Sequence, residues 1–149
     1  MIAIVITLIF TLDRLTKYWA TKVLMDNEGI SIIKGFFDFS YLENTGAAFG
    51  MLSGKLTFLT LIPIVVLVFL AYKYYKTKTK NVLLKLSGGM IAAGALGNLY
   101  DRIFYGYVVD FISVHYKNLY YFPTFNVADM SITIGTFLII IYVLKYVED

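Results

Sequence analysis

Four long apolar stretches constrain the fold of this chain more than any other feature. They cover about residues 2–20, 56–72, 82–100 and 130–147. Each approaches the roughly 20 residues that a helix needs to cross about 30 Å of hydrocarbon. Only 15% of the 149 residues are charged, against roughly 25% in ordinary soluble domains. We therefore expect one integral membrane domain over residues 1–149, mostly α-helical, with four transmembrane helices.

The lysines predict how these helices are oriented. No basic segment precedes the first stretch and no small-residue cleavage pattern follows it, so we expect a retained helix. The connection between the second and third stretches carries an uncompensated set of lysines: Lys73, Lys76, Lys78, Lys80 and Lys85. Basic loops stay on the cytoplasmic side. Both termini are then cytoplasmic, and the segments 21–55 and 101–129 are extracytoplasmic.

These two outer segments are rich in aromatic residues. Residues 32–43 alternate partly between apolar and polar side chains, which predicts short strands at the membrane interface. Residues 106–125 contain many Tyr and Phe residues, and their pattern leaves a short amphipathic helix or a flexible flap open. We expect a small β-rich extracytoplasmic segment beside the helices.

Two aspartates, Asp110 and Asp129, stand out against this apolar background. A carboxylate at or near hydrocarbon is costly and therefore indicates a functional site. The predicted topology brings the end of the first helix, the end of the third and the start of the fourth to the outer face. The unusual polar residues then gather at one level of the membrane: Asp13, Asn98, Arg102, Asp110, Asn126 and Asp129.

Some of these charges also have purely structural interpretations. Asp13 and Lys17 are four residues apart on a helix, a spacing at which opposite charges neutralise one another. Asp129 precedes an apolar helix and could act only as its N-cap. Asp101 could pair with the adjacent Arg102 or be an interfacial charge.

The third stretch combines close packing with polar groups. Gly89, Ala93 and Gly97 recur every four residues, which permits a neighbouring helix to approach closely. Asn98 and Arg102 recur at the same spacing on a neighbouring face. The structural alternative is that Arg102 extends to the lipid headgroups while Asn98 caps the helix end.

The missing residue types exclude several chemistries. The chain has no Cys, so disulfides, thiolate metal sites and Cys nucleophiles are excluded. His115 is the only His, which argues against a His-rich metal site. Two functional classes remain open at this point: a transporter or channel subunit that relays protons through the aspartates, and a membrane scaffold whose Tyr-rich segments bind a partner. A relay would place its carboxylates near the bilayer midplane, whereas these lie at helix ends.

Five short blocks of this sequence resemble the signatures of bacterial lipoprotein signal peptidases, also called signal peptidase II. They are DRLTK at 13–17, ENTGAAFG at 43–50, AGALGNLYDR at 93–102, VVDFI at 108–112 and FNVAD at 125–129, in the family's order. Arg14 stands where the family often has Gln, and Ala93-Gly94 where it often has Gly-Gly.

The resemblance implies an aspartic endopeptidase that removes the signal peptide from prolipoproteins, before a cysteine carrying diacylglycerol. Asp110 and Asp129 match the catalytic dyad of the family. Polar residues that hold substrate or order the site are matched by Asn44, Asn98, Arg102 and Asn126. Asp13 and Lys17 match a structural position on the first helix.

The resemblance also implies a location and partners. The family works in the bacterial inner membrane, with its active site at the extracytoplasmic face, and is inhibited by the lipopeptide globomycin. Residues 32–41 correspond to a small sheet, and part of 106–125 to a mobile flap. Besides prolipoproteins, membrane lipids are the expected partners, with no nucleic acid, no metal and no cofactor.

The chemistry of two carboxylates agrees with this interpretation. Two close carboxylates cannot both ionise cheaply, so they share a proton. The ionised carboxylate takes a proton from water, and the protonated one donates to the scissile carbonyl.

Overall fold

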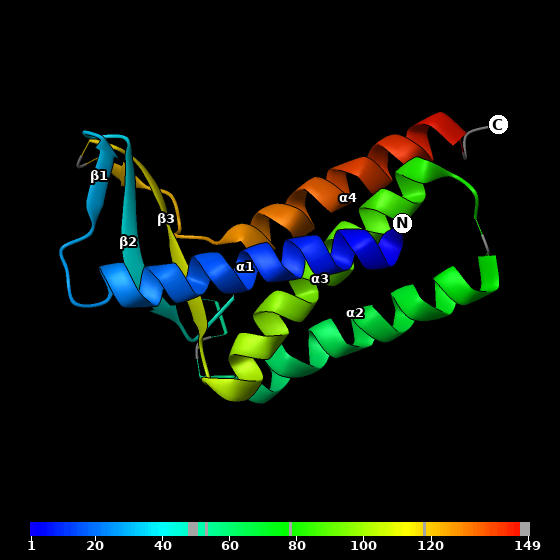
Figure 1. The fold of residues 1–149 in the computed structure, drawn as a ribbon, viewed down its shortest axis with the longest axis horizontal. Coiled ribbons are helices and arrows are strands. Elements are labelled where there is room, and N and C mark those ends of the chain that lie inside the picture. The colour runs from blue at the N-terminus through cyan, green and yellow to red at the C-terminus, as the bar shows by residue number, and fades with distance from the viewer. Residues whose placement is uncertain (48–50, 53, 78, 118, 147–149) are drawn as a thin grey trace.

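The computed structural model describes residues 1–47, 51–52, 54–77, 79–117 and 119–146. A helical bundle carries a small sheet at one end (Figure 1). The elements in chain order are α1 (Ile2–Leu24), β1 (Ile30–Ile33), β2 (Phe37–Asn44), α2 (Leu56–Thr77), α3 (Val82–Phe104), β3 (Val108–Tyr116), β4 (Tyr120–Tyr121) and α4 (Val127–Tyr146). The sheet is antiparallel, in the order β1-β2-β3-β4.

Three helices in the described part of the chain are long and apolar enough to cross a membrane: α2, α3 and α4. α1 has the same length as α3 but carries four charged side chains. Each helix differs from the predicted range: α1, α2 and α3 end later, and α4 begins at Val127 rather than at residue 130. The predicted end of the fourth helix at 147 lies outside the described residues.

The helices are arranged around α3. α1, α4 and α2 all contact it, and α1 also contacts α4. Gly94 and Gly97 permit the close approach of α4, because a Cβ on Gly94 would collide with the backbone oxygen of Ala128. A Cβ on Gly97 would come within 2.6 Å of a carboxylate oxygen of Asp13 on α1. The close packing predicted for the face of Gly97 is confirmed, and Gly94, on the neighbouring face with Asn98 and Arg102, packs closely as well.

An apolar cluster attaches the sheet to the end of α1. Ala20 and Leu24 of α1 pack with Val109 and Phe111 of β3, and all four are buried. Edge-to-face ring contacts of Trp19 extend this cluster. The small antiparallel sheet predicted outside the bundle is confirmed. Strands β3 and β4 occupy most of residues 106–125, so this segment is not the short helix that the sequence left open.

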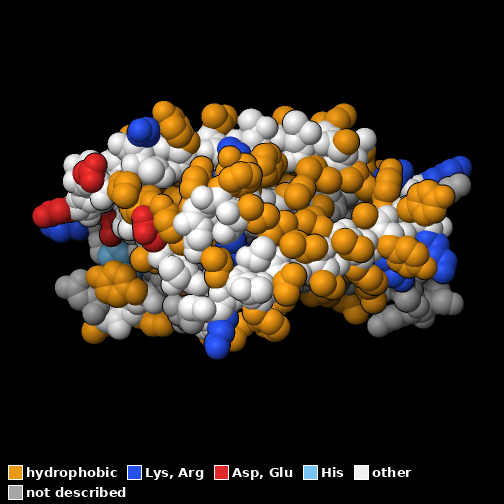
Figure 2. Space-filling view, turned by 90° about the horizontal axis from the view of Figure 1, so that it is seen from below, with side chains coloured by type: hydrophobic (Ala, Val, Ile, Leu, Met, Phe, Trp, Pro, Cys, Tyr) orange, Lys and Arg blue, Asp and Glu red, His pale blue; other side chains and the backbone are white. Residues whose placement is uncertain are grey.

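The surface separates an apolar belt from two polar ends. Hydrophobic side chains cover the helical part in the view of Figure 2. Acidic side chains in this view lie only at the sheet end, whereas basic ones lie at both ends and between them. The start of α1, the end of α4 and the connection from α2 to α3 share the end opposite the sheet (Figure 1).

Candidate active site

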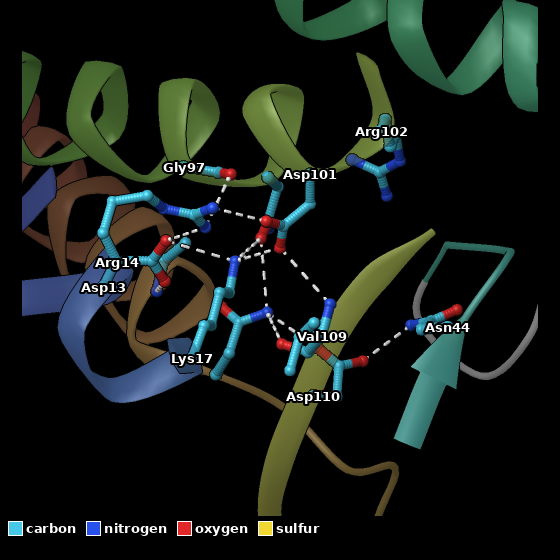
Figure 3. Close-up of polar contacts among 12 residues, drawn as sticks. Asp13, Arg14, Lys17, Asn44, Gly97, Asp101, Arg102, Val109 and Asp110 are labelled. Atoms are coloured by element: carbon cyan, nitrogen blue, oxygen red, sulfur yellow. Dashed lines mark hydrogen bonds and ion pairs between the residues drawn. The ribbon is translucent and has the colours of Figure 1, made fainter. Parts of the chain in front are cut away.

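Strand pairing positions Asp110. Asp110 lies on β3 opposite Leu42 of β2, and only 1% of its surface is exposed. Two residues further along β2, the side chain of Asn44 donates a hydrogen bond to Asp110 Oδ2 at 2.8 Å (Figure 3). The side-chain amide of Asn126 donates to the other oxygen, Oδ1, at 2.6 Å. Both carboxylate oxygens of Asp110 are therefore held by amides from different elements.

Asp129 is positioned by the first turn of α4. Its backbone N–H donates to Asn126 Oδ1 at 2.9 Å, and the backbone N–H of Asn126 donates back to Asp129 Oδ2 at 3.2 Å. This reciprocal pattern is a capping box with Asn126 as the N-cap. The interpretation of Asp129 as the N-cap is therefore wrong, because the cap lies three residues earlier.

Asn98 connects this pair to α1. Its side-chain nitrogen donates to Asp129 Oδ1 at 2.7 Å, and its oxygen accepts from Lys17 Nζ at 2.9 Å and from Asn126 at 3.2 Å. An ammonium can only donate, so Lys17 requires the amide oxygen on its own side. The amide nitrogen then has to face Asp129. Asn98 lies inside α3 and does not cap its end.

Four charged side chains form a compact cluster between α1 and α3 (Figure 3). Arg14 contacts Asp101 at 2.5 Å and Asp13 at 2.6 Å. Lys17 contacts Asp101 at 2.8 Å and Asp13 at 3.2 Å. Two acids and two bases balance, which offsets the cost of burying the charges. The predicted pair between Asp13 and Lys17 is confirmed, and Arg14 joins it unpredicted.

The cluster also fixes the backbone beside both aspartates. Asp101 accepts the backbone N–H of Val109 at 3.3 Å, one residue before Asp110. Asp13 accepts the backbone N–H of Ala128 at 3.1 Å, one residue before Asp129. The interpretation of Asp101 as the partner of its neighbour Arg102 is wrong, because Asp101 points toward α1.

A cleft of about 940 Å³ opens beside the two aspartates. Of the polar residues predicted for the site, those that line it are Asn44, Asn98, Arg102, Asp110 and Asp129. Arg102 donates to the backbone oxygen of Gly46 at 3.2 Å, across the cleft mouth from α3. Asn126 is fully buried, and its side-chain nitrogen is directed at protein atoms.

The remaining walls of the cleft are largely apolar. Met130 and Ile134 on α4 line one side, and residues 121–125 line another. Met130 and Ile134 are also among the exposed apolar side chains of the helix surface. The cleft therefore extends from the buried carboxylates to the apolar belt.

The carboxyl of Asp110 has a strongly shifted pKa. Burial, and after it the nearby charge of Asp129, raise the pKa of this carboxyl to about 7. Hydrogen bonds from Asn44 and Asn126 oppose the shift. Asp110 therefore exchanges a proton near neutral pH, as general acid–base catalysis requires. No group of three His, Cys, Asp or Glu side chains in the described ranges could hold a metal ion.

Known proteins share both this sequence and this fold. The sequence model of Signal peptidase (SPase) II matches residues 5–145. The lipoprotein signal peptidase of Clostridium tetani is 50% identical over 142 residues, 95% of this chain and 91% of that protein. The one of Staphylococcus aureus strain Newman is 42% identical over 133 residues, 89% of this chain and 81% of that protein.

A solved bacterial membrane enzyme superposes with a TM-score of 0.88 at 37% identity, covering 97% of this chain and 87% of that one. A second superposes with a TM-score of 0.85 at 38% identity and covers 97% and 93%. The likeness extends over nearly the whole length of both chains and includes the helices and the sheet that frame the cleft. With a family match over residues 5–145, this chain belongs to the signal peptidase II family.

Proposed function

We propose that this chain cleaves the signal peptide from prolipoproteins by an aspartic mechanism in which Asp110 and Asp129 form the dyad. The observation that carries the proposal is the joint placement of these carboxylates. Both line one cleft, and both are hydrogen-bonded by Asn126, once through its side chain and once through its backbone. Family membership supports the prolipoprotein substrate.

The dyad works with one shared proton. The ionised carboxylate removes a proton from water, and the protonated carboxyl donates to the carbonyl oxygen of the scissile bond. The water oxygen attacks the carbonyl carbon, and the peptide nitrogen leaves with a proton. A pKa of about 7 for Asp110 keeps one proton on the pair at neutral pH.

Some of the residues around the dyad contact the substrate, and others hold the side chains of the site in place. Asn44 and Arg102 lie at the cleft mouth, where they can hydrogen-bond the peptide backbone. Asn98 and Asn126 orient the two carboxylates. Lys17, with Asp13, sets the orientation of Asn98 from behind.

The proposed membrane arrangement agrees with the same geometry. Four transmembrane helices, α1 included, place the cleft at the extracytoplasmic face of the bacterial inner membrane. The exposed lysines at the α2–α3 connection then lie in the cytoplasm with both termini. The diacylglyceryl group of the substrate cysteine reaches the cleft from the bilayer, along the apolar side chains of α4.

Replacement of either aspartate tests the mechanism. Asp110→Asn and Asp129→Asn keep the shape of the side chain but remove its acid–base function, so each abolishes cleavage of a lipidated prolipoprotein in a gel-shift assay. Thermal unfolding in detergent checks that both variants fold. Substantial turnover by a folded variant contradicts the aspartic mechanism.

Globomycin offers an independent test through binding. Its hydroxyl is expected to lie between the two carboxylates as a mimic of the tetrahedral intermediate. Ligand-induced thermal stabilisation should then be lost in Asp110→Ala and in Asp129→Ala. Unchanged stabilisation of both variants would place the inhibitor elsewhere.

A further inference from the structure

The single histidine of the chain lies outside the dyad in an unusual contact geometry. His115 is on β3, five residues after Asp110, and is 6% exposed. Its Nε2 lies 2.7 Å from the carboxylate of Asp38 on β2. Its Nδ1 lies 2.8 Å from the backbone oxygen of Lys117.

These two contacts determine the charge of the ring. A carboxylate and a backbone carbonyl both accept hydrogen bonds, whereas a neutral imidazole donates from only one nitrogen. Both contacts are satisfied together only when His115 is an imidazolium. The pair with Asp38 is then a charge-assisted hydrogen bond between β2 and β3.

The His115 ring also contacts the wall of the catalytic cleft. It stacks on Tyr121 of β4 with ring centroids 4.8 Å apart and an interplanar angle of 12°. Tyr121 is the first residue of the wall formed by residues 121–125. The ring of His115 therefore lies between a carboxylate on β2 and the wall of the substrate cleft.

Strand pairing also joins the wall to β3, where His115 lies opposite Tyr121. Behind the wall lies a second hollow of about 410 Å³, and Phe122 and Phe125 line both this hollow and the cleft. Backbone hydrogen bonds join the wall to β3, from Phe122 to Val114 at 2.9 Å and from Phe125 to Ile112 at 3.1 Å. These bonds hold the backbone of the wall, and the His115 ring contacts the side chain of its first residue, Tyr121.

We propose that His115, as an imidazolium held by Asp38, is a positioning residue that keeps Tyr121 and the wall 121–125 in the conformation that binds substrate. The proposal rests on the proposed function, since the wall belongs to that cleft. His115 does not touch the reacting atoms. Its loss is therefore expected to weaken substrate binding more than the chemical step.

The charged and titratable groups around His115 give the pH range in which this contact holds. They are Asp38 on β2, Tyr121 on β4 and, on β3 itself, Tyr116 and Lys117, with the Lys117 ammonium over the ring of Tyr116. The pKa of His115 is raised, first by the Lys117 backbone oxygen and then by Asp38. The pKa of Asp38 is lowered, first by Ser31 and then by His115.

The sign of the pH dependence follows from the directions of these two pKa shifts. A histidine with a raised pKa contributes its contact fully below the ordinary value of about 6.5 and loses it as pH rises through the raised value. An aspartate with a lowered pKa keeps its contact fully above its ordinary pKa of about 3.9. It loses the contact only as pH falls through the lowered pKa. The contact is therefore intact in mildly acidic solution and is lost as pH rises through the raised pKa of His115.

Nuclear magnetic resonance can observe this histidine directly, because the chain has only one. Protein labelled with ¹⁵N-histidine in detergent micelles should show both ring nitrogens protonated at about pH 6.5, where a free histidine is half-charged. Asp38→Asn should lower the titration midpoint. A neutral ring at that pH would overturn the proposal whether or not the enzyme is active.

Kinetics test the positioning role. The ratio of KM for His115→Gln to KM for the parent chain cancels the titration of the dyad, which both proteins share. This ratio should be several-fold above one at mildly acidic pH and approach one as pH rises through the midpoint measured by resonance. The ratio of kcat should stay near one throughout. Tyr120→Phe, which changes the exposed neighbour on β4, is the matched control.

Two outcomes would overturn the positioning role: a KM ratio of one at every pH, or a raised ratio that does not change with pH. Should His115→Gln fail to fold, Tyr121→Leu removes the ring through which His115 acts. It should raise KM and abolish the dependence on His115 titration. A parent chain without any turnover would instead contradict the proposed function and leave the resonance result standing.

Discussion

Replacing Lys17 with Met tests the argument that the buried charge cluster holds the site together. Lys17 is 3% exposed and contacts Asp13, Asp101 and Asn98 within 3.2 Å. Its removal leaves two buried carboxylates against a single Arg14. Breaking a buried ion pair from one side costs about 3–5 kcal/mol.

The expected loss can be measured as a melting temperature. For a chain of this size, each kcal/mol lowers the melting temperature by roughly 2–4 °C, so Lys17→Met should melt roughly 6–20 °C below the parent chain. Thermal unfolding in detergent micelles provides the measurement. Activity should fall as well, because Asn98 loses the ammonium that orients its amide toward Asp129.

Two further variants isolate the cause. Lys22→Met removes an exposed lysine from the same helix and should change stability by less than about 0.5 kcal/mol. The double variant Lys17→Met with Asp101→Asn restores the charge balance and should be less destabilised than the sum of the single variants. A Lys17→Met protein that melts within about 2 °C of the parent would refute the reasoning.

Three other measurements address separate parts of the structure. Since the folded-state pKa of Asp110 is raised to about 7, kcat/KM should fall as pH rises through about 7 and the dyad loses its shared proton, and a profile flat to about pH 9 would contradict this. Gly94→Ala should lower the melting temperature, because its Cβ meets the backbone oxygen of Ala128, whereas normal stability would indicate looser packing of α3 on α4. With single cysteines introduced at Lys80 and Leu119, an impermeant reagent should label only the second in intact cells, and the reverse pattern would invert the topology.

The sequence predicted the helices and the joint placement of the polar residues well, for a physical reason. Apolar stretches of membrane length leave few alternative structures. The end of α3 with Asn98, the strand β3 with Asp110 and the start of α4 with Asp129 follow one another along the chain, so these side chains lie at the same end of the bundle. The same pattern could not determine side-chain partners, because these depend on how each helix is rotated.

The predictions that the structure contradicts concern these side-chain partners. Asp101 was paired with Arg102 because the two are adjacent, but adjacent residues on a helix point in different directions. Asp101 faces α1, where it contacts Arg14 and Lys17. Arg14 was recorded only as a departure from the usual Gln, although an extra cation next to a known acid could have suggested a second acid nearby.

The segment 106–125 was ambiguous for another reason. Its many aromatic residues leave a short amphipathic helix or a flexible flap open, because the alternation is irregular. Val108–Tyr116 forms a strand instead, and the pairing of this strand with β2 joins residues about 70 positions apart. The secondary-structure propensity of residues 106–125 could not reveal that β2 is the partner strand.

The charge cluster also bears on how the chain enters the membrane. α1 carries an acid and three bases, and it is not among the described helices that are long and apolar enough to cross a membrane, which are α2, α3 and α4. Among the described residues, the second acid that balances Arg14 and Lys17 is Asp101, which the ribosome adds much later, near the end of α3. In the proposed arrangement, α1 therefore waits at the membrane surface or within the insertion machinery until α3 arrives. The two helices then enter the lipid as a pair, which makes assembly of this enzyme dependent on a contact between its first and third helices.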